Sequence, residues 1–299
     1  MKKFLLLIAL IISGVGFVDA QNVGDNTIID YGSYSLKFTV TSVDPAKCSV
    51  TCSKMPTIQT SIEIPSTIEI ESVKFSVTTI GSNAFNGCTK LLNVDIPNTI
   101  TNIESSAFKS CSALTSVSFE KNSQLTSIGS NAFQYCSVLT SMVMPNTVSY
   151  IGYCAFQYCS ALTNIKIPKN VSVIENRTFD GCSKLTIIRC YAENVPTTGT
   201  YIFNGCPSNM TIYVPKNLIE TYKATSPWNS YNIDELPESL EIGQDFAIDY
   251  QGYSLKYIIT SVEPAECEIA YYTTTGDFDV SSITLPSSVI LSATVYNIV

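Results

Sequence analysis

Histidine is absent from the 299-residue chain, and tryptophan occurs once. Without imidazole the chain cannot form a Ser-His-Asp or Cys-His nucleophilic site, and it lacks the commonest general base near neutral pH. Charge is scarce as well, because 17 Lys and Arg stand against 25 Asp and Glu, for a net charge of -8. Nucleic-acid binding needs clustered positive charge, so we expect no nucleic-acid partner.

The N-terminus resembles a secretory signal. Met1-Lys2-Lys3 precedes an apolar run from Phe4 to Val18, and the small residue Ala20 ends the segment. The run of about 15 residues is shorter than the roughly 20 needed to span a bilayer. We therefore predict cleavage after Ala20, no transmembrane segment after cleavage, and a secreted or cell-surface protein.

A short stretch of sequence recurs along the chain. IGSNAFQYCS, from Ile128, returns as IGYCAFQYCS, from Ile151. The full set of copies is spaced by 23, 25, 23, 23 and 24 residues, and a cysteine follows each phenylalanine by three positions. The phenylalanines are Phe85, Phe108, Phe133, Phe156, Phe179 and Phe203. A fixed period of this length is typical of a solenoid.

Each copy contains a strand pattern behind its cysteine. Apolar residues alternate with polar ones, as at Val94 and Ile96, which predicts a strand with one buried face. Equivalent strands of successive coils would then stack in parallel. One copy alone cannot bury its apolar face, so stacking must create the core.

The pattern IGxxAFxxCxxLxxIxIPxxV is similar to that of the BspA-like leucine-rich repeats, which occur in surface and secreted proteins of Bacteroidetes. The similarity covers about residues 62–232, where Tyr213-Val214-Pro215, Tyr222 and Trp228 resemble the family's closing segment. It implies a β-dominated α/β solenoid: a right-handed leucine-rich repeat coil with a parallel concave sheet, flanked by small antiparallel β modules. It also implies a role in adhesion.

A longer duplication encloses the repeats. The segment from Gly24 to Cys48 returns from Gly243 to Cys267. We predict a signal peptide, an N-terminal β cap module, a solenoid with its C-terminal cap, a linker, and a second, truncated β cap module. Their ranges are 1–20, 21–80, 81–232, 233–242 and 243–299. The second module stops level with Thr78 of the first, so we expect a fragment of a longer protein or a short copy.

Eleven cysteines in an exported chain suggest disulfides. However, residues at equivalent positions of stacked coils point in the same direction, which favours a buried ladder of free thiols. Cys48 and Cys52 could form a local bridge. The spacing of the ladder cysteines lacks the pairs of a zinc site, so we predict no metal and no cofactor.

The residues that point out of the predicted sheet are the candidate contact surface. As binding residues we select Asn93, Asp95, Asn164, Lys166, Arg189 and Tyr213. They change along the stack from acidic and neutral to basic and aromatic. A second group, Tyr135, Tyr150, Tyr153 and Tyr158, lies at the coil edges, where we expect packing between coils rather than ligand contact.

These observations favour a binding protein over an enzyme. The predicted partners are host extracellular or other cell-surface proteins, and glycans are a further class. Two alternatives stay open: a structural spacer in a longer modular protein, and a glycan-binding or carbohydrate-active module. The carboxylate pairs Glu69/Glu71 and Asp277/Asp279 share a strand face, as glycosidase carboxylates can, but nothing around them resembles a catalytic site.

Overall fold

The computed structural model describes residues 22–58, 60–70 and 72–236, together with the backbone of five strands between residues 245 and 298. The chain divides into two compact units, with the boundary between Asp234 and Glu235 in the sequence, and each unit is described by itself. The predicted signal segment, 1–20, and residues 237–242 of the predicted linker lie outside the described residues. The domain boundaries stay predictions.

The first unit begins with a small antiparallel sheet. Leu36, Phe38 and Val40 are buried on one face, because a strand turns successive side chains to opposite sides. The third strand then pairs in parallel with β6, which connects this sheet to the coils. The strands are β1 (Asn26–Asp30), β2 (Ser35–Val43), β3 (Ala46–Lys54), β5 (Thr67–Ile70) and β6 (Val73–Ile80).

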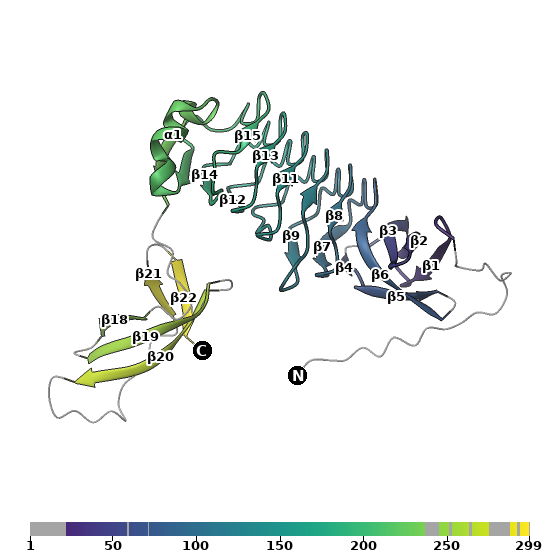
Figure 1. Ribbon diagram of the computed structural model, residues 1–299, viewed down its shortest axis with the longest axis horizontal. Coiled ribbons are helices and arrows are strands. Elements are labelled where there is room, and N and C mark those ends of the chain that lie inside the picture. The colour runs from purple at the N-terminus through teal and green to yellow at the C-terminus, as the bar shows by residue number, and fades with distance from the viewer. Residues whose placement is uncertain are drawn as a thin grey trace. The chain divides into compact units, whose positions relative to one another are not determined.

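Two rows of short parallel strands run along the coils (Figure 1). The first row continues from β6 and takes one buried isoleucine from each of five successive coils, Ile80 to Ile174. Its members are β8 (Asn102–Ile103), β10 (Ser127–Ile128), β11 (Tyr150–Ile151), β13 (Val173–Ile174) and β15 (Thr197–Thr198).

The second row consists of two separate sheets. The first contains β4 (Thr60–Glu63), β7 (Leu91–Ile96) and β9 (Ser116–Phe119), and the second contains β12 (Asn164–Ile167), β14 (Ile187–Cys190), β16 (Thr211–Val214) and β17 (Asn232–Glu235). Between them, residues 141–144 form only an isolated bridge from Val143 to Lys166. The interruption follows the coil that has two additional residues between Phe119 and Leu125.

The six repeat phenylalanines form one continuous stack. Their ring centroids are 5.1, 5.2, 5.4, 5.6 and 6.0 Å apart from Phe85 to Phe203. Phe133 and Phe156 therefore share one interior, as the repeat predicts. Burying a large side chain contributes about 1.5–3 kcal/mol, so several in every coil outweigh any surface pair.

Glycine in the Ile-Gly motif permits close stacking. A Cβ on Gly152 would lie 2.7 Å from the carbonyl carbon of Gly129 in the preceding coil. Gly129 in turn approaches the backbone of Glu104. No larger side chain fits at Gly129 and Gly152 without separating the coils.

The cysteines behind the phenylalanines are free thiols, as predicted. All ten cysteines in the described part of the chain are unpaired, so the bridge between Cys48 and Cys52 does not form there. From the second coil on, each ladder thiol donates to the carbonyl oxygen of the phenylalanine one coil earlier, at 3.1–3.3 Å. The thiols thus act as hydrogen-bond donors as well as apolar filler.

An aromatic cap closes the end of the phenylalanine stack. Trp228 and Tyr222 are fully buried, and the Trp228 ring meets Phe203 edge-on at 5.3 Å. The Tyr222 hydroxyl lies 3.2 Å from the thiol of Cys190. This segment holds the only helices of the described residues, which are the 3-10 helices Lys216–Leu218 and Trp228–Ser230 and α1 (Ile219–Ala224).

The second unit is a five-stranded sheet. Its order, β18-β19-β20-β22-β21, and its strand directions repeat those of β1-β2-β3-β6-β5. The strands are β18 (Asp245–Tyr250), β19 (Tyr253–Val262), β20 (Ala265–Thr274), β21 (Ser288–Leu291) and β22 (Thr294–Ile298). The backbone thus follows the duplication seen in the sequence.

The observed architecture is a β-dominated solenoid with parallel sheets. Helix is confined to the C-terminal cap of the described residues, so the α/β part of the predicted fold class is not confirmed. The right-handed sense of the coil and the concavity of its sheet stay predictions.

The buried thiols predict a loss of stability at alkaline pH. Burial raises the pKa of Cys111 to about 12 and raises the pKa of Cys136 and Cys159 well above the ordinary value. An unfolded thiol titrates near pH ~8.5, so between there and the folded pKa the unfolded chain releases protons that the folded chain retains. The free energy of unfolding should fall with pH, and the slope should approach about 1.4 kcal/mol per pH unit for each such thiol once the unfolded thiol is fully ionised.

Urea unfolding under reducing conditions at about pH 8 and about pH 9.5 measures this slope. Cys136→Ser is the matched control, since it removes one titrating thiol and keeps a donor for the Phe108 carbonyl, 3.2 Å from Sγ. It should reduce the average slope over this window by about 0.8 kcal/mol per pH unit, because an unfolded thiol is only partly ionised at pH 8. An unchanged slope in this variant would contradict the account.

Candidate functional site

The outward side chains of the first small sheet form a polar network. Asn93 pairs with Ser61 on one side and Ser116 on the other, and Asp95 pairs with Glu63 and Ser118. The Asn93 amide donates to the Ser61 hydroxyl at 3.0 Å and accepts from the Ser116 hydroxyl at 2.7 Å. The Ser118 hydroxyl donates to the Asp95 carboxylate.

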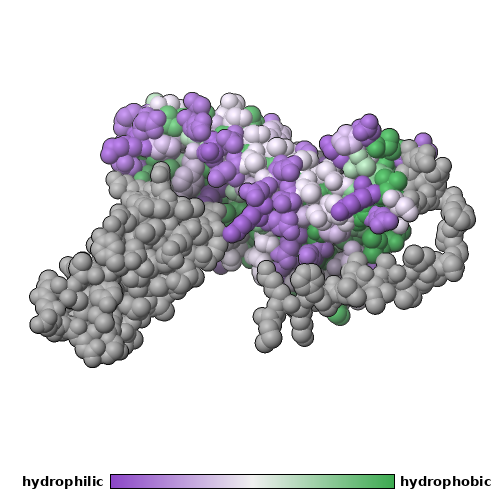
Figure 2. All heavy atoms as spheres, turned by 60° about the horizontal axis from the view of Figure 1, so that its bottom comes forward, coloured by the Kyte–Doolittle hydropathy of each residue, from purple (hydrophilic) through white to green (hydrophobic). Residues whose placement is uncertain are grey.

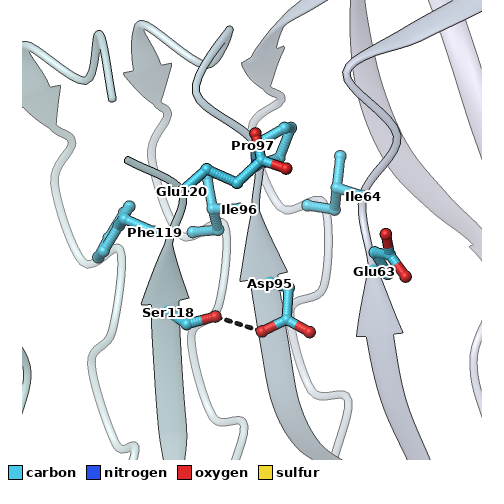
Figure 3. A pocket seen from close by; sticks show the side chains of 8 residues that line it. All are labelled: Glu63, Ile64, Asp95, Ile96, Pro97, Ser118, Phe119 and Glu120. Carbon is cyan, nitrogen blue, oxygen red and sulfur yellow. Dashed lines mark hydrogen bonds between the residues drawn. The ribbon is translucent and has the colours of Figure 1, made fainter. Parts of the chain in front are cut away.

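A hollow of about 390 Å³ lies where these strands end (Figure 3). Its apolar lining comes from Ile64, Ile96, Pro97 and Phe119, and Asp95 and Ser118 lie beside them on β7 and β9. Glu63 and Glu120 add two further carboxylates. This end of the sheet can therefore accept hydrogen bonds from a partner.

The carboxylates of the hollow are not arranged as metal ligands. Glu120 accepts from the backbone N–H of Asn98 at 3.0 Å, which holds it against the preceding coil. In the described parts of the chain, no group of three or more His, Cys, Asp or Glu residues could hold a metal ion.

The second small sheet presents a basic and aromatic row. Lys166 pairs with Arg189, and Arg189 pairs with Tyr213, on the parallel strands β12, β14 and β16. The Arg189 guanidinium lies over the Tyr213 ring, 5.7 Å from its centroid. Such a contact orients both side chains and contributes about 0.5–1 kcal/mol at an exposed site.

The six predicted contact residues thus fall into two groups. Asn93 and Asp95 lie on the first sheet, whereas Asn164, Lys166, Arg189 and Tyr213 lie on the second. Val143 forms an isolated bridge to Lys166 of the second sheet, and the described residues contain no continuous sheet between the two groups. Figure 2 brings this side forward and shows hydrophilic residues across its middle.

The tyrosines at the coil edges differ in part from expectation. Tyr135 and Tyr158 do pack between coils, with parallel rings 5.0 Å apart. They are nevertheless 43% and 42% exposed, and Tyr153 is 43% exposed. The sequence did contain a sign of this exposure. Tyr135 and Tyr158 stand two residues after the repeat phenylalanine, where other coils have a small residue such as Gly87 or Ser110.

The repeats match a known family. The pattern of the BspA type leucine-rich repeat region fits the chain in six copies, over residues 59–186 and 126–245. The chain belongs to this family. The resemblance of the repeat motif is therefore confirmed, and it includes the strands that carry all six candidate residues.

Several solved structures are similar to this chain at low sequence identity. The pneumococcal vaccine antigen PcpA has a TM-score of 0.54 and 22% identity, with 66% of this chain and 52% of that chain covered. A leucine-rich cell surface protein from Faecalibacterium prausnitzii has a TM-score of 0.49 and 21% identity, with 82% and 61% covered. A leucine-rich repeat protein from Bacteroides ovatus has a TM-score of 0.38 and 22% identity, with 68% and 60% covered.

The chain matches between about half and three-fifths of the length of these proteins. No curated protein matches it. Among the described residues, no helix is long and apolar enough to cross a membrane.

The outward row should contribute little to folding. Arg189→Ala and Tyr213→Ala should each change the free energy of unfolding by less than about 1 kcal/mol, because both side chains are only half-buried and their main described contact is one cation–π pair. Ile188→Ala, which replaces a fully buried neighbour on the same strand, should cost about 2–5 kcal/mol. Urea unfolding of the three variants measures the contrast, and a large loss in the Tyr213 variant would assign that ring to the core.

Proposed function

We propose that the chain is a secreted or cell-surface binding protein that contacts host extracellular or other cell-surface proteins through the outward faces of its two small sheets. The observation that carries the proposal is the row Lys166, Arg189 and Tyr213, held in register on parallel strands. Membership of the BspA type leucine-rich repeat family supports it. We infer that these sheets line the concave side of a right-handed coil.

The residue types favour a protein partner. Tyrosine and arginine are enriched among the residues that dominate binding energy in protein interfaces, because they offer large contact area and several donors. The Arg189–Tyr213 contact limits the freedom of both side chains before binding, which reduces the entropy lost on association.

The two groups also differ in charge. Glu63, Asp95 and Glu120 lie near the first sheet, whereas Lys166 and Arg189 lie on the second. A partner with a basic region for the first sheet and an acidic region for the second would bind in one orientation only. Turning the partner round would place like charges opposite each other. The polarity therefore supports a specific interface over general adhesiveness.

Export is part of the proposal. The charged start and short apolar run of residues 1–20 support it, and they lie outside the described residues. A binding role without catalysis agrees with the absence of histidine from the whole sequence. Asp95 is exposed and the other five candidate residues are half-buried, so all six keep some surface for a partner.

A structural spacer is the second candidate. The observation that favours it is the second unit, whose strand order and directions repeat those of the N-terminal module. Repetition of a module is typical of long modular surface proteins. In that case the outward rows would be solvated strand faces without a partner. A glycan as ligand of the same sheets is the remaining alternative.

The test compares binding of the parent chain and of a triple variant, Lys166→Ser, Arg189→Ser and Tyr213→Ser, to an array of host extracellular-matrix proteins. Loss of two charged anchors and one aromatic anchor should weaken binding at least about 30-fold, since the loss of even one anchor of this kind costs about 2 kcal/mol or more. Lys169→Ser with Lys184→Ser is the control, because it removes two exposed positive charges away from the row.

If the triple variant kept full affinity, the partner would not bind through Lys166, Arg189 and Tyr213, and the proposed contact surface would be wrong. Absence of any binding by the parent chain would favour the spacer. Equal weakening in the lysine control would indicate a general charge effect rather than a specific surface.

A further inference from the structure

Cys52, near the end of β3, lies where the N-terminal sheet meets the first coil. From Phe85 to Phe179, each repeat phenylalanine donates its backbone N–H to the residue that directly precedes the next repeat phenylalanine, as Phe85 does to Ala107 at 2.6 Å. Cys52 donates to Ala84 in the same way, at 2.8 Å. Cys52 therefore occupies the phenylalanine position of a coil that would precede the first repeat.

The phenylalanine position lies beside the ladder cysteine of the next coil. From Cys111 on, the thiol of each ladder cysteine approaches the phenylalanine one coil earlier, with Sγ 3.1–3.3 Å from its carbonyl oxygen. Cys88 is the first member of the ladder, and Cys52 stands in the place of that phenylalanine. The repeat geometry thus puts two cysteines at one contact.

The two thiols interact directly. A hydrogen bond with the Cys88 thiol lowers the pKa of Cys52, and the same bond, together with burial, raises the pKa of Cys88. Cys52 in turn donates to the carbonyl oxygen of Lys54 at 3.1 Å. Its side chain packs against the core cluster that contains Cys88. Both sulfur atoms therefore lie on the inner side of the contact between sheet and coil.

The pair combines an accessible thiol with a buried one. Cys52 is half-buried, whereas Cys88 is 1% exposed. A small reagent from solvent can therefore reach Cys52 first. The thiolate is the reactive form of cysteine, and the lowered pKa of Cys52 favours that form.

Other cysteine pairings are less favourable. Cys48 and Cys52 are four residues apart on β3, and a strand rises about 3.3 Å per residue, so their Cα atoms are about 13 Å apart. A disulfide needs Cα atoms within about 7 Å of each other. Neighbouring ladder cysteines point in the same direction, and from Cys111 on each thiol has its own carbonyl acceptor. Cys52 and Cys88 differ because one side chain comes from the phenylalanine position and the other from the cysteine position.

The duplicated module indicates that Cys52 is not needed for the strand itself. Cys48 aligns with Cys267 in the second copy, whereas Cys52 aligns with Tyr271. A thiol at this place is therefore a property of the copy whose third strand lies next to Cys88.

We propose that Cys52 and Cys88 are a disulfide-forming pair that joins the N-terminal sheet to the first coil when the chain meets a small disulfide such as oxidised glutathione. The Cys52 thiolate attacks the small disulfide, and one small thiol leaves. The Cys88 thiolate then attacks the sulfur of Cys52, and the second small thiol leaves. Two cysteine thiols are oxidised, and the small disulfide is reduced to two thiols, which take up the two protons.

The bond encloses the 35 residues between Cys52 and Cys88, which include β4, β5 and β6. A link of this kind restricts the unfolded chain and fixes β4, which carries Glu63 of the hollow, between its two ends. Contact with an oxidant outside the cell rests on the export proposed above, whereas the juxtaposition of the two thiols does not depend on it.

The test treats the reduced full chain with oxidised glutathione, blocks the remaining thiols with N-ethylmaleimide, and maps tryptic peptides by mass spectrometry without reduction. Residues 48–54 and 75–90, which contain Cys52 and Cys88, should be joined in the majority of molecules. Fragmentation of the joined peptides distinguishes Cys52 from Cys48. The bridged chain should melt at least about 5 °C above the reduced chain.

Three variants complete the design. Cys52→Ser removes the accessible thiol and should leave Cys88 reduced. Cys88→Ser removes the second nucleophile and should leave a stable glutathione adduct on Cys52. Cys206→Ser is the matched control, because Cys206 is a half-buried ladder thiol in the last repeat, and its loss should leave the bridge unchanged.

The pairing is wrong if Cys52 of the parent chain stays reduced or keeps its glutathione, since the two sulfur atoms then do not meet. A bridge between Cys48 and Cys52, or linkages as scattered as those formed in concentrated urea, would also contradict it. A bridged chain that melts no higher than the reduced one would show that the bond forms only after the fold opens. None of these results involves Lys166, Arg189 or Tyr213, so failure of the two proposals can be told apart.

Discussion

The register between successive coils is the constraint on which the rest of the structure depends. Every coil buries its apolar side only against its neighbours, so the phenylalanines must follow one another at 5.1 to 6.0 Å. The same register brings the backbone of Gly152 against that of Gly129 and directs each ladder thiol to a carbonyl one coil earlier. A ladder of free cysteines is then the expected outcome, because their side chains are parallel and each has its own acceptor. The aromatic cap covers the last phenylalanine, and Trp228 meets Phe203 edge-on rather than continuing the parallel stack.

Register also makes side chains at equivalent positions direct neighbours. Inside the solenoid this favours the same residue type at equivalent positions, because identical side chains pack well on one another. Where side chains are polar, it favours neighbours of which one donates and the other accepts, as in the series Gln134, Gln157, Asp180 and Asn204. On the outward sheet faces neither rule applies strongly, since water satisfies each group. Those columns are consequently the ones in which Asp95, Arg189 and Tyr213 can differ from coil to coil without loss of the fold.

Much of the fold follows from the sequence alone, because a period is visible without knowledge of long-range contacts. The spacing of Phe133 and Phe156 and the alternation around Ile165 sufficed to place the core and the inward side of each strand. The break between the two small sheets was not predictable in this way. Met142 and Met144 alternate as a strand should and are buried, yet only the bridge at Val143 forms there. Strand pairing depends on backbone alignment across two coils, which residue types do not reveal.

The edge tyrosines show a second limit of periodic patterns. A period identifies the residues that share a column, but the direction of the column depends on backbone dihedral angles. Tyr158 was predictable as a neighbour of Tyr135, whereas its exposure follows from a positive φ that glycine normally occupies. In a repeat protein, each coil can be compared with the others at equivalent positions. Gly181 is the residue that the positive φ of this turn favours, whereas Tyr158 places a large side chain at the same position in spite of the backbone cost. Some residues raise the backbone energy relative to the residues at equivalent positions of other coils and are not fully buried. Such residues are therefore the strongest candidates for a role in function rather than in folding.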